Sequence, residues 1–417
     1  MRTITVRRVA AAVLAASAAL GTLATSAVAG DRGDNPLQAA TEAYRVAYPQ
    51  LPAARARAAA AQSAARRAVY DAAATHAATF GGAWFEPVTG VVHLAATTDA
   101  ATRQAAALGR RHGVAVEPHR VSRSAAALAA RAAELRAGGG AIGTAANGRV
   151  GVDVESNRVV AAVPASRRAT LRSSAAAAGD VKLVDDPGLR VQPDASCTSR
   201  AACDSSIRAG AIIWRSDSSI PWCSVGFTAR DAGNQRYVYT AGHCWTGDGI
   251  TWGTGAQEIG PLTSSLDAGA IDASVIAVTN PWFAGDPGGE IYTEGDSFSL
   301  PVQRVAETVS EMVAGEVVCL AANFSAPRGD NPCGVLGTNS DAAVRGMPRV
   351  DGVDACGGDS GGGWYGLSSS GTRSAYGIHS RSDGGCHGDA GGNRSWFTAI
   401  ATVREGFQPG LTIETRP

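Results

Sequence analysis

The chain has 417 residues and a formal net charge of zero at pH 7, from 37 basic and 37 acidic side chains. This length exceeds the usual size of one domain, so two folded units are expected. The charges are unevenly divided: residues 30–194 carry 20 basic and 14 acidic side chains, whereas residues 195–417 carry 14 and 23. The acidic second half argues against nucleic acid as a partner, and the opposite charges favour attraction between the halves.

The first residues have the pattern of a secretory signal peptide. Three arginines within the first eight residues precede a short apolar run, which ends in the small residues Ala27-Val28-Ala29. That run is too short to span a membrane, and no later segment offers about 18 uninterrupted apolar residues. We therefore predict a signal peptide over residues 1–29, secretion of the remainder to the extracellular space, and no membrane attachment after cleavage.

The segment after the signal peptide combines helix with two small α+β units. Residues 37–80 are rich in alanine and arginine, which favours helix interrupted near Pro49 and Pro52. Next, "FGGAWFEPVTGVVHLAATT" predicts two strands around a Pro-Val-Thr-Gly turn, and "DAATRQAAALGRRHG" predicts a helix. The same order recurs in "GRVGVDVESNRVVAAVPASRRATLRSSAAAAGD", with a helix from about Pro164. Two strand–turn–strand–helix units are therefore expected.

After about residue 195 the pattern changes to Gly, Ser, Thr and Val with short apolar runs such as "RYVYTAGH" and "ASVIAVTN". Short runs separated by turn residues predict antiparallel β structure, as a sandwich or a barrel. Pro, Gly and Ser concentrate between Pro187 and Arg208, which places the domain boundary there. We predict one unit over residues 30–198 and a second over residues 199–417.

All eight cysteines lie in the second half. An even number in an exported chain predicts disulfides, although eight cysteines allow 105 pairings and spacing leaves the connectivity open. No CxxC motif is present, and His243, His379 and His387 lack the spacing of zinc ligands. No metal and no cofactor are therefore expected.

The segment "DACGGDSGGGW", residues 354–364, places Ser360 among glycines behind a cysteine. A serine hydroxyl attacks a carbonyl only when a base is in reach and a third group orients that base. His243, in "YVYTAGHCW", is the candidate base, and Asp267 and Asp272 compete for the third role. Asp272 is preferred because it opens the apolar run "ASVIAV", where a buried carboxylate needs a partner.

"TAGHC", "IDASVIAV" and "GDSGG", in the order His, Asp, Ser, resemble the trypsin/chymotrypsin family of serine proteases. The finer similarity is to the bacterial branch that contains α-lytic protease and the streptogrisins. It is carried over residues 205–410 by "CSVGFTARDAGNQRYVYTAGHCW", "VCLAANFSAPRGDNPCG", "ACGGDSGGG" and "NRSWFTAI". The resemblance implies a mainly β mature domain, built from two six-stranded antiparallel β-barrels and a C-terminal helix, preceded by an α+β pro-region.

The upstream segments "FGGAWFEPVTGVVHLA" and "GVDVESNRVVAAV" resemble the two lobes of the pro-region that this branch carries. The resemblance implies a secreted, monomeric serine endopeptidase made as a zymogen, with its own pro-region as folding aid and inhibitor and with protein or peptide substrates. It assigns the general base and acid to His243, the orienting acid to Asp272 and the nucleophile to Ser360. The backbone N–H groups of Gly358 and Ser360 would form the oxyanion hole. The implied disulfides are Cys223–Cys244, Cys319–Cys333 and Cys356–Cys386, which leaves Cys197 to pair with Cys203.

The residues expected around the substrate depart from this branch. The spacing between Cys356 and Ser360 matches that of the trypsins, so the resemblance implies that Asp354 lies where trypsins keep the acid at the base of the primary specificity pocket. A carboxylate there would pair with a substrate Arg or Lys side chain. The alternative is a solvated loop acid within "RVDGVDAC", which also contains Asp351. Ser380 would lie against the substrate backbone. On the opposite wall Ser382 replaces an expected glycine and Arg381 a small or aromatic residue, so an apolar preference is the alternative.

A second departure concerns Asp359, the acid beside the nucleophile. The branch usually neutralises this acid with a cation that follows the first cysteine of the middle loop, where this chain has Leu320. An unpaired buried carboxylate costs several kcal/mol, so Arg328 or Arg345 would have to replace that cation. His379, which precedes Ser380, is expected to face inward as a packing residue.

Two other functions compete with peptide hydrolysis. "GDSGG" also fits the GxSxG motif of α/β-hydrolase esterases, but that fold orders Ser, acid, His and needs parallel βαβ units. Only 57 residues follow Ser360, and the first acid among them, Asp383, lies four residues before His387, which excludes the esterase. A non-catalytic binding member of the same family would normally have lost a triad residue, whereas all three are present.

Overall fold

The computed structural model describes residues 35–185, 207–216, 223–245, 247, 249–254, 257–286, 288–292, 299–322, 331–384 and 393–416. The expected signal peptide and the limit at residues 198 and 199 lie outside these ranges, as do Cys197, Cys203, Cys386, Arg328 and His387. None of the helices within these ranges is long and apolar enough to cross a membrane.

The alanine-rich segment forms three helices. The Asn35 side chain accepts a hydrogen bond from the Gln38 N–H, and Pro36 occupies the first helical turn, so the first helix begins with a cap and a residue suited to that position. The predicted interruption near Pro49 and Pro52 is confirmed, because the chain leaves the helix before these prolines and resumes it after Pro52. The helices are α1 (Pro36–Ala47), α2 (Ala53–Ala61) and α3 (Ser63–Ala74).

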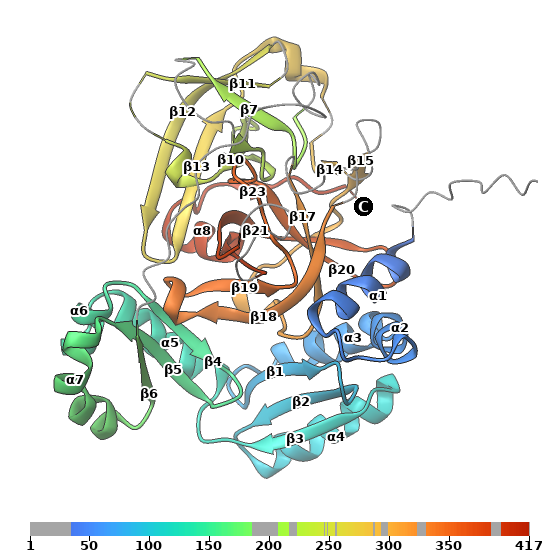
Figure 1. Ribbon diagram of the computed structural model, residues 1–417, viewed down its shortest axis with the longest axis vertical. Coiled ribbons are helices and arrows are strands. Elements are labelled where there is room, and N and C mark those ends of the chain that lie inside the picture. The colour runs from blue at the N-terminus through green and yellow to red at the C-terminus, as the bar shows by residue number, and fades with distance from the viewer. Residues whose placement is uncertain are drawn as a thin grey trace, which may run out of the picture. The chain divides into compact units, whose positions relative to one another are not determined.

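The first α+β lobe is a three-stranded sheet covered by a helix (Figure 1). Its hairpin and helix follow the prediction, and the helix connects the hairpin to a third strand that runs parallel to the second. A parallel pair needs such a crossover, usually a helix. The buried side chains of Val92 and Leu94 face the helix residues Ala101 and Ala105 in one apolar cluster. The elements are β1 (Phe80–Glu86), β2 (Val91–Ala96), α4 (Asp99–His112) and β3 (Val116–Arg120).

The second lobe repeats this arrangement, again with a third strand that the sequence analysis did not predict. Two further helices precede its hairpin, and Leu128, Ile142, Val159 and Leu171 belong to its core. Both strand–turn–strand–helix units are therefore present, each completed by a parallel strand. The elements are α5 (Ala125–Arg136), α6 (Gly140–Ala146), β4 (Val150–Asp153), β5 (Arg158–Val163), α7 (Ala165–Ala178) and β6 (Val181–Asp185).

From residue 207 onward the described chain is mainly β, and its first sheet curls into a barrel. Strand β8 pairs with β7 at one end of the sheet, and the next strand, β9, pairs with β10 near the other end. Because β8 and β9 follow one another in the chain, the two ends of the sheet lie close together. Trp252 and Ile259 are among the buried residues that fill this barrel. The strands are β7 (Ile212–Arg215), β8 (Cys223–Ser224), β9 (Thr228–Arg230), β10 (Arg236–Thr240), β11 (Thr251–Thr254), β12 (Gln257–Ala268) and β13 (Ile271–Ala277).

The second barrel closes with six strands, because β21 pairs with both β20 and β22 in the order β21-β20-β17-β18-β19-β22. Leu320, Trp364 and Phe397 lie in its core. The expected mainly β fold with two barrel-like antiparallel sheets and a C-terminal helix is confirmed. In the described residues only this second sheet closes with the six expected strands, whereas the first has eight strands in its order and forms a half-barrel. The strands are β17 (Val317–Ala321), β18 (Cys333–Asp341), β19 (Met347–Asp351), β20 (Gly363–Leu367), β21 (Arg373–Ser382) and β22 (Arg394–Ala399).

Short elements link the two barrels. The helix α8 follows β22 directly, and β23 then returns to the first sheet, where it pairs with β9. The chain end therefore ties the second barrel to the first. The short elements are β14 (Glu290–Tyr292), β15 (Ser299–Pro301), β16 (Arg304–Val305), α8 (Ile400–Gly406) and β23 (Thr412–Ile413).

Candidate active site

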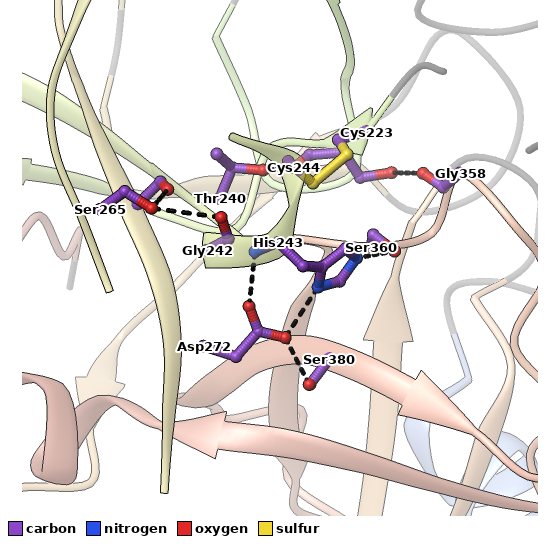
Figure 2. The surroundings of a disulfide bond; sticks show 12 residues. Cys223, Thr240, Gly242, His243, Cys244, Ser265, Asp272, Gly358, Ser360 and Ser380 are labelled. Carbon is purple, nitrogen blue, oxygen red and sulfur yellow. Dashed lines mark hydrogen bonds and ion pairs between the residues drawn. A yellow bond between two sulfur atoms is a disulfide. The ribbon is translucent and has the colours of Figure 1, made fainter. Parts of the chain in front are cut away.

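His243 lies in a single 3-10 turn, Gly242–Cys244, which follows β10 at the mouth of the first barrel. The disulfide between Cys223 and Cys244 ties this turn to β8, with the two Cα atoms 6.6 Å apart (Figure 2). The expected pairing of these two cysteines is present. The histidine backbone is therefore anchored on both sides by structure of the first barrel.

Asp272 is the second residue of β13 and is fully buried. Its two carboxylate oxygens accept hydrogen bonds from the backbone N–H of His243 and from the His243 Nδ1, each at 2.8 Å. Its own N–H donates to the Thr398 Oγ1 at 2.9 Å, and Thr398 belongs to β22 of the second barrel. The carboxylate thus fixes the imidazole while its strand is tied to the neighbouring barrel.

Ser360 reaches the same place from the second barrel, in a turn before β20. Its Oγ lies 2.8 Å from the His243 Nε2, and the residue is 7% exposed (Figure 2). A continuous hydrogen-bonded chain therefore runs from Asp272 through His243 to Ser360. The two barrels each supply part of it, so the barrel packing sets its geometry.

The electrostatics of Asp272 favour its charged form. Burial raises its pKa, but the charge of His243 and hydrogen bonds from His243 and Ser380 outweigh burial and hold the pKa of the carboxyl well below its usual value. The Ser380 hydroxyl, on β21, donates to the carboxylate oxygen that also accepts from the His243 Nδ1. Asp272 thus has three hydrogen-bond donors around it, as a buried carboxylate requires.

The competing acid Asp267 lies elsewhere. It pairs across the β12–β13 hairpin with Asp272 in backbone register, but its side chain is 39% exposed and forms an ion pair with Arg345 at 2.5 Å. Arg345 also donates to the backbone carbonyls of Gly269 and Ile271. The structure therefore brings Asp272, and not Asp267, to His243, and it places the Arg345 guanidinium at the hairpin end.

The backbone around Ser360 is shaped by Gly358, whose φ of 90° is a conformation that side-chain-bearing residues rarely adopt. The Ser224 hydroxyl donates to the Gly358 carbonyl at 2.9 Å, and the Ser224 N–H donates to the Ser360 carbonyl at 2.7 Å. Within the described part of the chain, no group accepts a hydrogen bond from the N–H of Gly358 or of Ser360. Both N–H groups thus remain available beside the Ser360 hydroxyl.

Two of the expected substrate-binding residues are linked through the second barrel. The Ser382 Oγ lies 2.9 Å from the Ser395 Oγ, which donates to the Val353 carbonyl at 2.9 Å. Val353 directly precedes Asp354, which is half-buried. The strand that carries Ser382 and the segment that carries Asp354 are therefore neighbours.

Arg381 is 8% exposed, and its Nε donates to the Ser380 Oγ at 3.2 Å. Burial is the main reason why its pKa lies below the ordinary value, while the nearby carboxylates of Asp272 and Asp267 oppose that shift. The guanidinium therefore lies on the side of β21 that faces Asp272.

Two further disulfides were expected from the resemblance, Cys319–Cys333 and Cys356–Cys386. Cys319 and Cys333 form the expected disulfide. Cys356 is disulfide-bonded, and its expected partner Cys386 is outside the described residues.

Asp359 is fully buried, and its carboxylate accepts a hydrogen bond from the Cys356 N–H at 2.7 Å. Among the two candidate cations for Asp359, Arg345 makes the contacts given above and Arg328 is not described.

His379 is 3% exposed and faces inward, as expected of a packing residue. The Trp364 Nε1 donates to its Nδ1 at 3.2 Å, and the two rings lie 6.0 Å apart. Burial, and to a smaller extent the charge of His243, lowers the pKa of His379 to about 3. The ring therefore stays neutral at neutral pH.

Sequence reasoning missed two residues that support the site. Thr398 is 126 residues from Asp272, and Ser224 is 134 residues from Gly358. Neither belongs to a motif with a recognisable spacing, because both act only through contacts between distant strands. The only sequence signal for Thr398 is its place in "NRSWFTAI", one of the segments that carry the family resemblance.

No family model matches the chain, and no curated protein sequence matches it. Among solved structures, the chain is similar to the crystal structure of Nocardiopsis protease (NAPase), with 22% sequence identity over 50% of this chain and 100% of that one and a TM-score of 0.39. It is also similar to a glutamic acid specific serine protease described as using a novel histidine triad in substrate binding, with 23% identity, the same coverage and a TM-score of 0.38. Each similarity leaves half of this chain without a counterpart.

Proposed function

We propose that the chain is the precursor of a secreted serine endopeptidase. The observation that carries this proposal is the hydrogen-bonded chain from the buried carboxylate of Asp272 through both nitrogens of His243 to the Ser360 hydroxyl. A nucleophile, its base and a group that orients the base are what acyl transfer at neutral pH requires.

The reaction begins when the Ser360 Oγ attacks the carbonyl carbon of the substrate peptide bond while the His243 Nε2 takes the hydroxyl proton. The tetrahedral intermediate then collapses, the C–N bond breaks, and His243 returns the proton to the leaving amine. A water molecule, activated by the same imidazole, attacks the acyl-enzyme and releases the acid product. The first proton transfer uses the contact of 2.8 Å between Nε2 and Oγ, and the last returns a proton from Nε2 to Oγ as the acyl–oxygen bond breaks, whereas the leaving amine and the water exchange their protons with Nε2 directly.

Asp272 serves this cycle by holding the imidazole in the reactive tautomer. Its contact with Nδ1 keeps the proton on that nitrogen, so Nε2 is free to accept the proton of the hydroxyl. Because the pKa of the carboxyl is well below its usual value, the carboxylate stays charged when the imidazolium forms. The hydroxyl of Ser380 supports the same charge.

We assign the oxyanion hole to the N–H groups of Gly358 and Ser360. The left-handed φ of Gly358 orients this turn, and the Ser224 hydrogen bonds fix the carbonyls of both residues. Such fixed donors stabilise the charge that develops on the substrate oxygen, and each is worth about 3 to 4 kcal/mol of barrier.

For specificity we propose a preference for Arg or Lys on the acyl side of the cleaved bond, with Asp354 as the carboxylate that binds it. The support is the position of Asp354 next to Val353, which is linked to Ser382 through Ser395. Arginyl, phenylalanyl and alanyl chromogenic peptides test this point, and faster hydrolysis of the apolar substrates would remove Asp354 from the pocket.

We further propose that residues 30–198 act as a pro-region that binds the protease domain. Their positive charge suits the acidic second half. The support is a set of contacts between the two parts, in which Arg66 forms an ion pair with Glu316 at 2.6 Å and the Phe85 N–H donates to the Ala314 carbonyl at 2.9 Å.

The catalytic assignment is tested by replacing the nucleophile. Ser360→Ala should abolish both peptide cleavage and labelling by a fluorophosphonate, whereas the exposed serine of the β20–β21 turn, replaced in Ser370→Ala, should leave both unchanged. Cleavage that persists in folded Ser360→Ala contradicts the mechanism. A wild-type protein that binds peptides without cleaving them would instead support the non-catalytic alternative.

The two aspartates of the β12–β13 hairpin provide a second, matched comparison. Asp272→Asn should lower kcat by about 10⁴-fold because the imidazole tautomer is no longer fixed. Asp267 lies opposite Asp272 in the hairpin, and Asp267→Asn removes only its partly exposed ion pair with Arg345. This substitution should change kcat by less than about twofold. Equal effects of the two substitutions would contradict the role of Asp272.

A further inference from the structure

The sheet of the first lobe carries an unusual group of side chains on the face opposite α4. His93 of β2 is paired in register with Trp84 of β1 and with Glu117 of β3, and His119 lies two residues further along β3. Side chains alternate between the faces of a strand, so these four residues share one face. The apolar side chains of the intervening residues face the helix, as Val92 and Leu94 do.

The two imidazoles and the carboxylate converge. The His93 Nδ1 lies 2.8 Å from the His119 Nε2, and oxygens of Glu117 lie 4.0 and 3.7 Å from these two nitrogens. All three ligand atoms lie within 4.8 Å of one another. Ligand atoms on one tetrahedral zinc ion are about 3.3 Å apart, given zinc–nitrogen bonds of about 2.0 Å, so shifts of a few tenths of an ångström would bring the set together.

The surroundings hold the two rings as metal ligands need to be held. The Trp84 indole stacks on both imidazoles, with centroid distances of 4.9 Å to His93 and 5.2 Å to His119. The second ring nitrogen of His93 faces the Glu86 carboxylate at 3.7 Å. A carboxylate that accepts a hydrogen bond from the other nitrogen of a ligating histidine fixes the tautomer and raises the basicity of the ligand, and a shift of Glu86 by less than about 1 Å would make that bond.

We propose that His93, His119 and Glu117 form a binding site for a divalent transition-metal ion, with Zn²⁺ as the expected occupant and Glu86 as a positioning residue. Two neutral imidazoles and one carboxylate suit zinc, and the half-exposed Glu117 leaves one side of the site open to water. The ion would join β2 to β3, which are parallel strands separated by the whole of α4. This proposal is independent of the peptidase assignment.

The burial of the two histidine side chains also favours a specific metal site over non-specific binding of an ion at the surface. The His93 side chain is 12% exposed and that of His119 is 35% exposed, whereas Glu117 is 60% exposed. The two rings are therefore already ordered before an ion binds, and they have to separate only slightly while the exposed carboxylate moves closer. Pre-ordered ligands lose less conformational entropy on binding.

The test uses the untagged Ser360→Ala precursor, so that no affinity tag supplies histidines and self-cleavage is prevented. Isothermal titration with ZnCl₂ should show one ion per chain. His93→Gln and His119→Gln should each weaken binding by at least about 100-fold, and Glu117→Gln and Glu86→Gln by about 10-fold or more. His76→Gln, which alters an exposed histidine near the start of β1, is the matched control and should leave the affinity unchanged.

Zinc binding that survives the loss of His93 or His119 overturns the proposal, as does the absence of binding to the parent protein. Because Glu117 and Glu86 are half-exposed, their substitutions test the site even if a histidine variant does not fold. Thermal unfolding is a second readout: zinc should raise the midpoint of the parent and of His76→Gln but not of His93→Gln.

Discussion

Two neighbouring residues on β21, His379 and Ser380, lie in different electrostatic environments. The Ser380 hydroxyl supports the ionised Asp272, whereas His379 is held neutral in the core beneath Trp364. The difference follows from strand alternation, which directs successive side chains to opposite faces. Asp272 could be chosen over Asp267 from the sequence because it begins a buried apolar strand. The supporting roles of Ser380 and Thr398 toward that carboxylate depend on strands that meet only in the folded barrels.

His379 makes stability depend on pH. An unfolded histidine takes up a proton as pH falls through about 6.5, whereas in the folded protein the pKa of His379 is lowered to about 3. Between these values the unfolded chain binds more protons, so the stabilisation that is complete above pH 6.5 is lost as pH falls toward 3. The slope for one such group is about 1.4 kcal/mol per pH unit.

We predict that His379→Gln, which keeps an acceptor for the Trp364 Nε1, flattens this dependence. Urea unfolding of the Ser360→Ala precursor at pH 7, 5.5 and 4.5 measures it. The free energy of unfolding should fall less steeply in the variant, by on the order of 1 kcal/mol per pH unit. Parallel curves for the two proteins would show that His379 is not the group responsible.

At the level of elements, the hairpins and the helices α4 and α7 of the two lobes could be predicted because their signals are local: a turn sequence between two apolar runs, followed by an alanine-rich segment. The third strands β3 and β6 could not, since each pairs in parallel with a strand on the far side of a helix. For the same reason, the spacing of His93 and His119 in the sequence does not predict that they lie close together. In the barrels, the motifs fixed the ends of β10 and β13 but not the pairing of β21 with β22.

The turn that carries His243 packs tightly against the β12–β13 hairpin. A Cβ atom on Gly242 would lie 2.4 Å from the Leu266 carbonyl oxygen and 2.9 Å from the Ala273 N, so the turn would have to shift. We predict that Gly242→Ala lowers kcat by at least about 100-fold, because displacements of about 1 Å in a catalytic group have effects of that size. Peptide hydrolysis by folded protein measures it.

Gly247→Ala is the control for this substitution, since Gly247 follows in the same loop and a Cβ atom there meets nothing within 4 Å. Its activity should match that of the parent. If Gly242→Ala retained full activity while circular dichroism showed an unchanged fold, close packing of the turn would not be what positions His243.

At the scale of the whole molecule, basic residues of the first segment meet acidic residues of the second. Arg66 of α3 is fully buried and donates two parallel hydrogen bonds to Glu316, at 2.6 and 2.7 Å. The same guanidinium donates to the Tyr44 hydroxyl and the Ala59 carbonyl, and the Tyr70 hydroxyl donates to Glu316. All of the charge that this contact buries is therefore paired.

Removing one partner of a buried ion pair costs about 3 to 5 kcal/mol, because the other charge is left without compensation. We predict that residues 205–417 produced alone are inactive, and that residues 30–190 added in trans restore activity. The same segment with Arg66→Met should bind about 10²- to 10⁴-fold more weakly. Arg57→Met, at an exposed position of α2, is the matched control and should restore activity at the parent concentration.

Replacing both partners of the ion pair distinguishes the effect of the lost charge from the effect of the lost side-chain packing. If Glu316 is replaced by Leu in the protease part, the partner segment with Arg66→Met should regain much of its affinity, because a buried ion pair and an apolar pair of similar volume are often nearly equivalent. Failure of this rescue would mean that Arg66 acts through its packing over Phe85, where its Cζ lies 3.7 Å from the ring centroid, rather than through charge. Restoration of activity by the Arg66→Met segment at the parent concentration would exclude this contact as a determinant of docking.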